Sequence, residues 1–368
     1  MIANRLAERI ERLVPRESDF RAPAHDVRVT ARIGLWLGIA FGLCFVTGLL
    51  SHAIQHPPGW FWWPSRPAGL YRVTQGVHVI SGVAAIPLLL AKLWTVYPKL
   101  FGRPLFRSVP HAIERVSILV LSGAAFFELG TGIFNSVQNY LWGFYFPTAH
   151  FAVAWIAIGS ILVHIAVKLP VIRRGLGERT SGQADLSRRQ FLRTTTLAAG
   201  VAVVAIAGST VPLLRNVSPL AWRSASGLPV NRTAAAASIT VTTAWRLEVV
   251  TPQGIRTYTL DELNALPLTT AELPIACVEG WSASATWTGI PIRNLTGETN
   301  VRVLSSERNG LYATSILPAE HTRDPETLLA LRLNGETLTL DHGYPCRIIA
   351  PSRPGVLQTK WVRRLEVL

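Results

Sequence analysis

Apolar residues gather in long runs in the first part of the chain. Four runs cover about residues 33–52, 70–91, 113–134 and 148–169, and a fifth, rich in Ala and Val, covers about 195–214. A helix of about 20 apolar residues is long enough to cross a hydrocarbon layer roughly 30 Å thick. The pattern therefore predicts an all-α bundle of four transmembrane helices, followed by a fifth.

From about residue 240 the pattern changes to short segments in which apolar and polar residues alternate, separated by Gly, Pro and Asn. Alternation with a period of two is typical of strands. The last third of this multi-domain protein is therefore expected to be an α+β, mostly β domain. The expected order is a cytoplasmic lead (1–30), a four-helix membrane domain (31–175), a segment with the fifth helix (176–216), a linker (217–240) and the β-rich domain (241–368).

The charged residues predict how the helices cross the membrane. The chain has 36 Lys and Arg against 22 Asp and Glu, but the excess falls in short blocks between the apolar runs, which argues against a nucleic-acid partner. Loops rich in Lys and Arg favour the cytoplasmic side of a membrane, so the basic loops 92–107 and 168–193 are expected in the cytoplasm. Aromatic loops suit the membrane interface, and the two aromatic loops, 55–67 and 139–147, are expected on the outer side. The β-rich domain is then extracytoplasmic, on the cytoplasmic membrane of a prokaryote.

The residues before the fifth run resemble a twin-arginine export signal. Arg188 and Arg189 are followed by Phe191 and Leu192 and by a weakly apolar, Ala-rich run. This export route carries proteins that fold, usually around a cofactor, before they cross the membrane. A plain double arginine at the cytoplasmic end of a helix is the alternative.

Histidines within the apolar runs are candidate metal ligands. His78 lies in the second run, and His150 and His164 lie 14 positions apart in the fourth, about 21 Å along one helix face. Intramembrane ionisable groups are costly and are commonly functional. Together the three favour haem b held by imidazole pairs, with a hydrogen bond between helices as the alternative for any one of them. Glu128, in the third run, is expected to serve quinone or proton chemistry or to bond a neighbour.

The four helices resemble the cytochrome b subunits of formate dehydrogenase and Ni,Fe-hydrogenase, and the small haem subunit of methionine sulfoxide reductase systems. The resemblance covers about residues 25–175 and implies that His78 and His150 ligate one haem toward the outer side. His164 would need a histidine early in the first helix to hold a second haem, and the chain has none there. Alternatively, His52 pairs with His150 and leaves His78 with His164. One haem is expected.

The most distinctive stretch of the chain is PIACVEGWSASATWTGIPIRNL, residues 274–295. A cysteine in such an apolar setting is most often a buried, inert thiol. Here, however, Cys-Val-Glu-Gly-Trp-Ser followed by Trp-x-Gly-x-Pro resembles the molybdopterin-binding domain of the sulfite oxidase superfamily. The resemblance implies that the thiolate of Cys277 binds molybdenum in a catalytic centre that exchanges an oxygen atom and two electrons with its substrate.

This resemblance continues to the carboxyl end of the chain. It implies that Arg347 grips the phosphate of the cofactor, as guanidinium groups commonly do. Cys346 is expected to pack in the core, because neighbouring side chains on a strand point in opposite directions. The full set of residues implied to contact the cofactor is Thr314, His342, Arg347, Gln358, Thr359 and Lys360.

These expectations combine into a membrane-bound, molybdopterin-dependent oxidoreductase. Electrons would pass between quinone or another electron carrier, haem b and molybdenum, and the small substrate would be an oxygen-atom donor such as a sulfoxide. The chain ends at Leu368, without the immunoglobulin-like domain of sulfite oxidases, which argues against sulfite as the substrate. Two alternatives are a haem-free, membrane-anchored molybdenum enzyme with a soluble electron partner, and a cofactor-free extracytoplasmic binding module.

Overall fold

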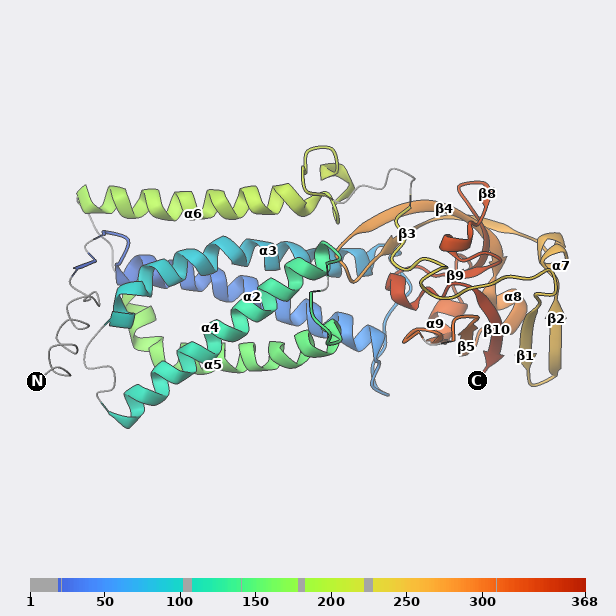
Figure 1. The fold of residues 1–368 in the computed structure, drawn as a ribbon, viewed down its shortest axis with the longest axis horizontal. Coiled ribbons are helices and arrows are strands. Elements are labelled where there is room, and N and C mark those ends of the chain that lie inside the picture. Colours follow the sequence, from blue (N-terminus) through green and yellow to red (C-terminus); the bar gives the residue numbers. More distant parts are fainter. Residues whose placement is uncertain are drawn as a thin grey trace, which may run out of the picture. The chain divides into compact units, whose positions relative to one another are not determined.

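The structure is a computed structural model that describes residues 19–20, 22–101, 108–139, 141–177, 183–221, 228–308 and 310–368 (Figure 1). Most of the expected cytoplasmic lead and the basic residues Arg103, Arg107 and Arg179 lie outside these ranges. The chain divides into two compact units. The helical unit comprises Met1–Gly48 and Val77–Ala205, and the β-rich unit comprises Leu49–Gly76 and Ile206–Leu368.

Five long helices occupy the predicted apolar runs in the described part of the chain (Figure 1). All five are long and apolar enough to cross a membrane. They extend past the apolar runs because polar residues continue the helical hydrogen bonding; at the start of the third, for example, the Ser108 hydroxyl accepts a bond from the His111 N–H. The bounds are α2 (Val27–Gln55), α3 (Leu70–Val96), α4 (Val109–Ser136), α5 (Phe146–Gly177) and α6 (Gln183–Ala207).

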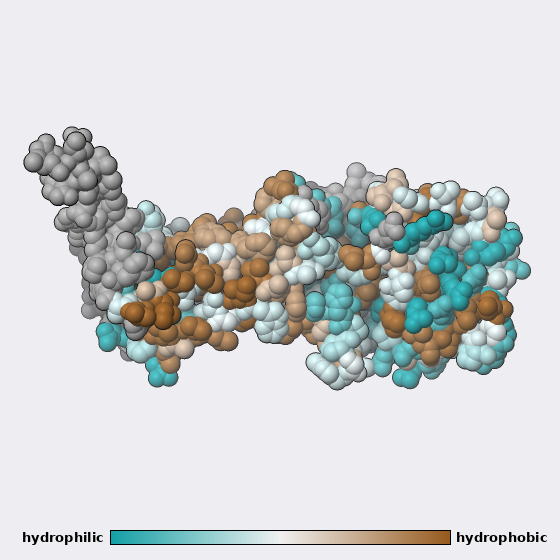
Figure 2. All heavy atoms as spheres, turned by 60° about the horizontal axis from the view of Figure 1, so that its bottom comes forward, coloured by the Kyte–Doolittle hydropathy of each residue, from teal (hydrophilic) through white to brown (hydrophobic). Residues whose placement is uncertain are grey.

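The helical unit buries few of its large apolar side chains. Trp36, Leu119 and Leu197 are 59%, 72% and 67% exposed, and Figure 2 colours much of the surface of the helices as hydrophobic. A helix that faces lipid has this composition, because no polar face is needed there. Near the start of α6, Phe191 and Leu192 pack against a small core of α2 and α3 residues.

The β-rich unit contains two five-stranded sheets. One has the strand order β2-β1-β10-β5-β6, and the other runs β3-β4-β7-β8 with β9 also paired to β7. All pairs are antiparallel except β1 with β10. The strands are β1 (Leu247–Thr251), β2 (Gly254–Tyr258), β3 (Thr269–Ala276), β4 (Ser282–Pro291), β5 (Val301–Ser305), β6 (Thr314–Leu317), β7 (Leu328–Leu333), β8 (Glu336–Thr337), β9 (Arg347–Ile349) and β10 (Val362–Val367).

Alternation of side chains along the strands builds the core of this unit. In β5, Val301 and Val303 are fully buried whereas Arg302 is exposed, as the pleat requires. The short turn η3 (Pro212–Leu214) follows α6, and the strands are connected by short helices and turns that include α7 (Leu260–Ala265), α8 (Ile292–Thr296), α9 (Ala319–Thr322), η4 (Leu340–His342) and η5 (Gly355–Leu357). A β-rich last third after a helical first part is what the sequence predicts.

The second half of the predicted linker packs on the β-rich unit. Ala234 and Ala237 are 3% and 7% exposed and lie against Trp361. The backbone N–H of Ala234 also donates to Asp341 Oδ1 at 2.7 Å. Small side chains allow this close approach to the indole. Residues 222–227 of the predicted linker lie outside the described residues.

Candidate functional site

Cys277 begins the short turn between β3 and β4. Its backbone N–H donates to the Trp281 carbonyl at 2.8 Å, and its carbonyl accepts a bond from the Gly280 N–H at 3.1 Å. Gly280 has a φ of +89°, a left-handed conformation that favours glycine. The Gly-Trp-Ser signal in the sequence thus marks the turn that places the thiol where β3 ends.

The thiol of Cys277 is buried beside a carboxylate. The residue is 1% exposed, and its Sγ donates to Glu279 Oε2 at 3.3 Å. The indole N–H of Trp281 donates to the same oxygen at 3.0 Å. Burial, and then the negative charge of Glu279, raise the pKa of the Cys277 thiol. A thiolate at this position therefore needs a positive partner such as a metal ion.

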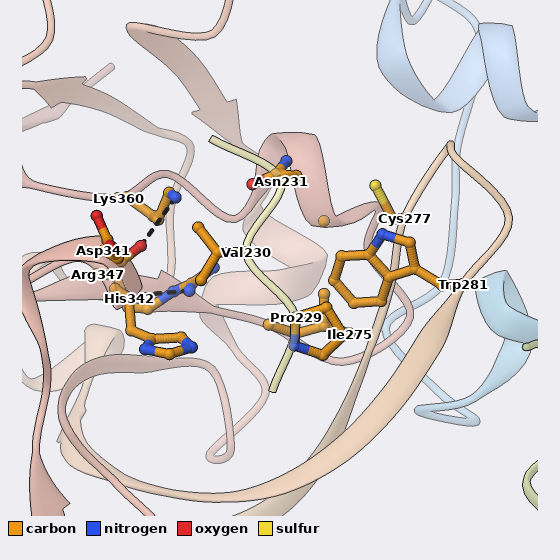
Figure 3. A pocket seen from close by; sticks show the side chains of 11 residues that line it. Pro229, Val230, Asn231, Ile275, Cys277, Trp281, Asp341, His342, Arg347 and Lys360 are labelled. Atoms are coloured by element: carbon orange, nitrogen blue, oxygen red, sulfur yellow. Dashed lines mark hydrogen bonds between the residues drawn. The ribbon is translucent and has the colours of Figure 1, made fainter. Parts of the chain in front are cut away.

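A cleft of about 310 Å³, counting the solvent at its mouth, opens beside this turn. Figure 3 shows Cys277 and Trp281 at one end, the basic residues at the other, and the segment Pro229–Asn231 running between them. The lining residues come from several distant parts of the β-rich unit. They are Pro229, Val230, Asn231, Ile275, Cys277, Trp281, Asp341, His342, Arg347, Gly355 and Lys360.

Arg347, at the start of β9, is a buried cation. It is 5% exposed, its guanidinium donates to the carbonyls of His342 (3.1 Å) and Gln358 (3.2 Å), and it lies 5.2 Å from the ring centre of Trp287. Its Nε has no hydrogen-bond partner. Burial lowers the pKa of Arg347 to about 9. Within the described residues no carboxylate forms an ion pair with it, so the guanidinium is available to an anion.

Lys360 adds a second cation to the same end of the cleft. Its Nζ donates to the carbonyls of Arg232 (2.5 Å) and Asp341 (3.0 Å) and lies 4.6 Å from the ring centre of Trp361. Burial, and then repulsion from Arg347, lower the pKa of Lys360 to about 7. A bound anion would relieve that repulsion and favour the charged form of the lysine.

Gly343 leaves room for the side chains of Arg347 and Lys360, which both pack against its backbone. It has a φ of +108°, and a Cβ there would lie 3.0 Å from Arg347 Cβ and 3.2 Å from Lys360 Cβ. A larger residue would therefore strain the backbone and displace the basic side chains. The neighbouring His342 lines the cleft with Nδ1 2.8 Å from Thr339 Oγ1 and Nε2 3.0 Å from the Leu228 carbonyl.

The other expected cofactor contacts lie outside the lining of the cleft. Gln358 is 1% exposed, donates to the Arg353 carbonyl at 2.9 Å and accepts from Arg347 through its own carbonyl. Thr359 Oγ1 lies 2.8 Å from Ser315 Oγ, also in the interior. Thr314 is exposed, because it points to the opposite face of β6 from the buried Ser315.

Four of the expected contacts, Cys277, His342, Arg347 and Lys360, therefore meet at the cleft. Sequence reasoning missed the segment Pro229–Asn231, which it placed in a linker. The signal there is a polar Asn231 that follows Pro229 and Val230 and precedes Arg232, too short a pattern to separate from a loop. Trp281 and Gly355, which also line the cleft, are not among the residues that the sequence predicts for the site.

In the helical unit, His78 and His150 lie side by side. Their ring centres are 6.2 Å apart with planes at 72°. His78 Nδ1 lies 2.9 Å from the Cys44 carbonyl oxygen. His150 Nε2 lies 3.1 Å from Glu128 Oε2, and its Nδ1 lies 3.2 Å from Thr131 Oγ1. The structure thus brings together the pair that the resemblance implies, and Glu128 bonds one of them.

The remaining histidines have other neighbours. His52, near the end of α2, stacks on His56 of the β-rich unit with ring centres 4.8 Å apart. His164 lies farther along α5 than His150, near Lys168 and Glu114, which form an ion pair with each other.

Residues 234–368 match the family model of the oxidoreductase molybdopterin binding domain. This last third of the chain is therefore a molybdopterin-binding oxidoreductase domain of the sulfite oxidase type, as the sequence predicts. Its boundary agrees with the packing of Ala234 and Ala237 on Trp361.

Several known proteins resemble parts of the chain. The putative protein-methionine-sulfoxide reductase subunit YedZ1 of Azospira oryzae is 33% identical over 114 residues, 30% of this chain and 43% of that protein. The sulfite oxidase of Arabidopsis thaliana is 31% identical over 113 residues, 24% of this chain and 29% of its own length. The structure of the sulfane dehydrogenase SoxCD from Paracoccus pantotrophus matches with a TM-score of 0.32 and 22% identity, over 35% of this chain and 39% of that one. The chain spans less than half the length of each.

The basic end of the cleft fits an anionic pterin cofactor. Within the part of the chain that the structure describes, Arg347 and Lys360 donate to backbone carbonyls, and Arg347 Nε is buried without a hydrogen-bond partner. Buried cations are costly unless a negative group joins them, and a phosphate supplies the charge and the acceptors they lack. At the other end, Cys277 is a soft ligand of the kind that molybdenum accepts.

Proposed function

We propose that the chain is an integral membrane oxidoreductase in which a molybdopterin domain outside the cytoplasm exchanges electrons with haem b in the helices. Quinol or another electron carrier is the proposed donor, and a small sulfoxide is the proposed substrate. The observation that carries the proposal is the cleft in a molybdopterin-type domain, with Cys277 at one end and, at the other, Arg347 and Lys360, neither of which forms an ion pair with a carboxylate of the described residues.

Each end of the cleft has a distinct part in this proposal. Bound molybdenum supplies the exchange of one oxygen atom and two electrons; reduction of a sulfoxide also takes up two protons and releases water. Cys277 would hold the metal, while Arg347 and Lys360 would hold the negative end of the pterin. Glu279 Oε2, 3.3 Å from the sulfur, is placed to accept the proton that the thiol loses when it becomes a ligand.

The haem part of the proposal rests on His78 and His150. Their ring centres lie 6.2 Å apart, so these two imidazoles from different helices would be the residues to hold a haem iron. His150 Nε2 contacts Glu128, so ligation through that nitrogen requires the carboxylate to move. The same contact favours the alternative in which the pair only bonds helices and a soluble partner delivers electrons to molybdenum.

The division of the chain into two compact units supports the proposed orientation in the membrane. The predicted outer loop 55–67 belongs to the same compact unit as residues 206–368. Positive-inside charges place both on the side opposite the basic connections. The agreement supports an extracytoplasmic position for the molybdopterin domain.

Elemental analysis and a visible spectrum of the purified full-length protein test the proposal. We expect about one molybdenum per chain and a reduced b-type α band. Molybdenum without the band would favour the haem-free anchor, and no molybdenum would favour a binding module. Reduced and oxidised electron mediators, each offered with sulfoxides and with sulfite, then determine the substrate class and the direction of electron flow.

A further inference from the structure

The connection between α2 and α3 is part of the β-rich unit. Residues 49–76, which include the adjoining turns of both helices, share this unit with the two sheets. Ile54 and Tyr71 are 7% and 1% exposed and form a small core with Ala276, the residue before Cys277. The last residue of β3 therefore packs on helices α2 and α3 as well as within its own sheet.

The Cys277 turn is held at both ends from outside the sheets. On one side, the buried Gln75 donates from Nε2 to the Val278 carbonyl at 3.2 Å. On the other, the backbone N–H of Ser282 donates to the Ser209 carbonyl at 2.8 Å, just after α6. Bonds at both ends limit the freedom of a short turn, which otherwise moves more than the strands it joins.

A second contact from the same connection reaches the stretch of backbone that leads to Gly355, another residue that lines the cleft. Trp63 Nε1 donates to the Ser352 carbonyl at 2.7 Å, and the Ser352 N–H donates to the Ala68 carbonyl at 2.8 Å. Ser352 has a φ of +54°, which is unfavourable for a residue other than glycine and persists only where neighbours hold it. Gly355, which lines the cleft, follows three residues later.

The two contacts act on adjoining stretches of backbone. Pro354 forms a parallel bridge with Ala276, so the segment after Ser352 lies directly beside the residue before Cys277. Arg66 anchors the connection further, through bonds of 2.7 and 2.9 Å to Asp324 and one of 2.6 Å to Glu326. A shift of the connection would therefore move both the Cys277 turn and the adjoining backbone at Gly355.

We propose that Gln75 and Trp63 are positioning residues of the molybdenum site. Gln75 fixes the turn that carries the Cys277 thiol, and Trp63 fixes the neighbouring wall through Ser352. Groups that orient a metal ligand from behind commonly change metal affinity or activity about 10- to 100-fold when removed. This inference rests on the proposed role of Cys277 as the molybdenum ligand.

Matched substitutions in the full-length protein test the inference. Gln75→Met and Trp63→Phe remove one N–H donor each and keep most of the side-chain volume. Arg72→Met is the control for the first, since Arg72 lies one turn away and its guanidinium donates to the Ser284 hydroxyl of β4 at 3.2 Å instead of to the Cys277 turn. Trp62→Phe is the control for the second, since Trp62 is 60% exposed.

The readouts are molybdenum content, the Mo(V) electron paramagnetic resonance spectrum and kcat. We expect Gln75→Met and Trp63→Phe to change the Mo(V) g values and to lower kcat or molybdenum content about 10-fold. Arg72→Met and Trp62→Phe should match the wild type in all three. A purely structural role would lower the yield of folded protein without changing the spectrum of the molecules that bind metal.

Failure of this inference can be separated from failure of the proposed function. If the wild type binds no molybdenum, or Cys277→Ser leaves the Mo(V) spectrum unchanged, the ligand assignment is wrong. If that assignment holds and both test variants keep wild-type spectra, content and rates, the positioning role is wrong. Should Gln75→Met not accumulate as folded protein, the spectrum of Trp63→Phe alone decides the outcome.

Discussion

At the scale of single residues, the two cysteines of the β-rich unit show that burial alone does not identify a metal ligand. Cys277 is 1% and Cys346 0% exposed, and burial raises the pKa of both thiols. Cys346 Sγ lies in the apolar core, 3.5 Å from the Val362 carbonyl. Only Cys277 lines a cleft and has, in Glu279, a carboxylate to receive its proton.

Replacing Cys277 by alanine should therefore affect activity, whereas replacing Cys346 by alanine should affect stability. If Cys277 is the molybdenum ligand proposed above, we expect Cys277→Ala to lower turnover at least about 100-fold, and to leave unchanged any haem absorbance of the wild type. Cys346→Ala should keep the rate but lower the free energy of unfolding by about 1–2 kcal/mol, because it leaves a small cavity in the core. Parallel assays and thermal unfolding check both; retained turnover in Cys277→Ala would refute its role as a ligand.

Lys360 makes the stability of the cofactor-free protein depend on pH. Burial lowers its pKa to about 7, below the ordinary lysine value of 10.5, so the unfolded chain binds more protons between these values. The free energy of unfolding should then rise with pH above about 7, by something on the order of 1 kcal/mol for this group. A bound anionic cofactor should abolish the effect, since it keeps the lysine charged.

Protein from a host that cannot make the pterin allows this measurement. The melting temperature would be followed from pH 6.5 to 9.5 for the wild type and for Lys360→Met. The variant should have a flatter profile, and loading with cofactor should flatten the wild-type profile. Equal slopes in cofactor-free wild type and variant would mean that another group, such as Arg347, produces the dependence.

At the scale of elements, the α2–α3 connection is held to the β-rich unit by an unusual ion pair. Asp324 has a side chain that is only 3% exposed and accepts two bonds from Arg66, which is 49% exposed. Burial raises the pKa of Asp324, but the bonds from Arg66 outweigh it and the net pKa is lowered. Loss of Arg66 would leave a buried carboxylate with less compensation.

We expect Arg66→Ala to lower the free energy of unfolding by about 1–2 kcal/mol, less than a fully buried pair because half of the guanidinium is solvated. Arg302→Ala is the control, since Arg302 pairs with Glu366 at 3.0 Å on the surface and should cost at most about 1 kcal/mol. Thermal unfolding, with Asp324→Asn as the second arm of a double-mutant cycle, gives the coupling. Equal costs for the two arginines would show that burial of Asp324 contributes nothing.

The helices and strands that the sequence predicts best are those in which a simple environment, either lipid or one buried face, determines the pattern of apolar residues. Long apolar runs predict α2 to α6 because a membrane-spanning helix needs no polar face, and alternation predicts β5 and β10 because one face of each is buried. The resemblance supplies the order of the site residues. It does not resolve which residue of a strand points inward, and Ser315 is buried where Thr314 was expected to make the contact.

At the scale of the whole molecule, the β-rich unit is assembled from two separate parts of the chain. Trp63 and Ser352 are 289 positions apart and share a hydrogen bond. Composition marks residues 55–67 only as an aromatic loop, because the partner that buries Trp63 lies in another domain of the sequence. The same holds for Pro229–Asn231, whose place in the cleft depends on tertiary packing and not on any local pattern.

The order of folding and export matters for a domain that is assembled from distant parts of the chain. If the molybdopterin domain folds around its cofactor in the cytoplasm and crosses the membrane afterwards, Arg188 and Arg189 should be needed for it to reach the outside. In the structure, Arg188 also pairs with Asp26 at 2.9 Å, so a local structural role competes with a signalling one. Lysine keeps the charge but is not equivalent to arginine in recognition.

Protease added to the outside of intact spheroplasts should digest the molybdopterin domain of the wild type but not of the Arg188→Lys, Arg189→Lys double variant. Arg173→Lys with Arg174→Lys is the control, because that pair lies at the end of α5 and should not affect export. Asp26→Asn separates the two roles of Arg188. If it alone keeps the domain inside, the ion pair with Asp26 matters and the signal does not; if the double-lysine variant is exported normally, the twin-arginine prediction is wrong.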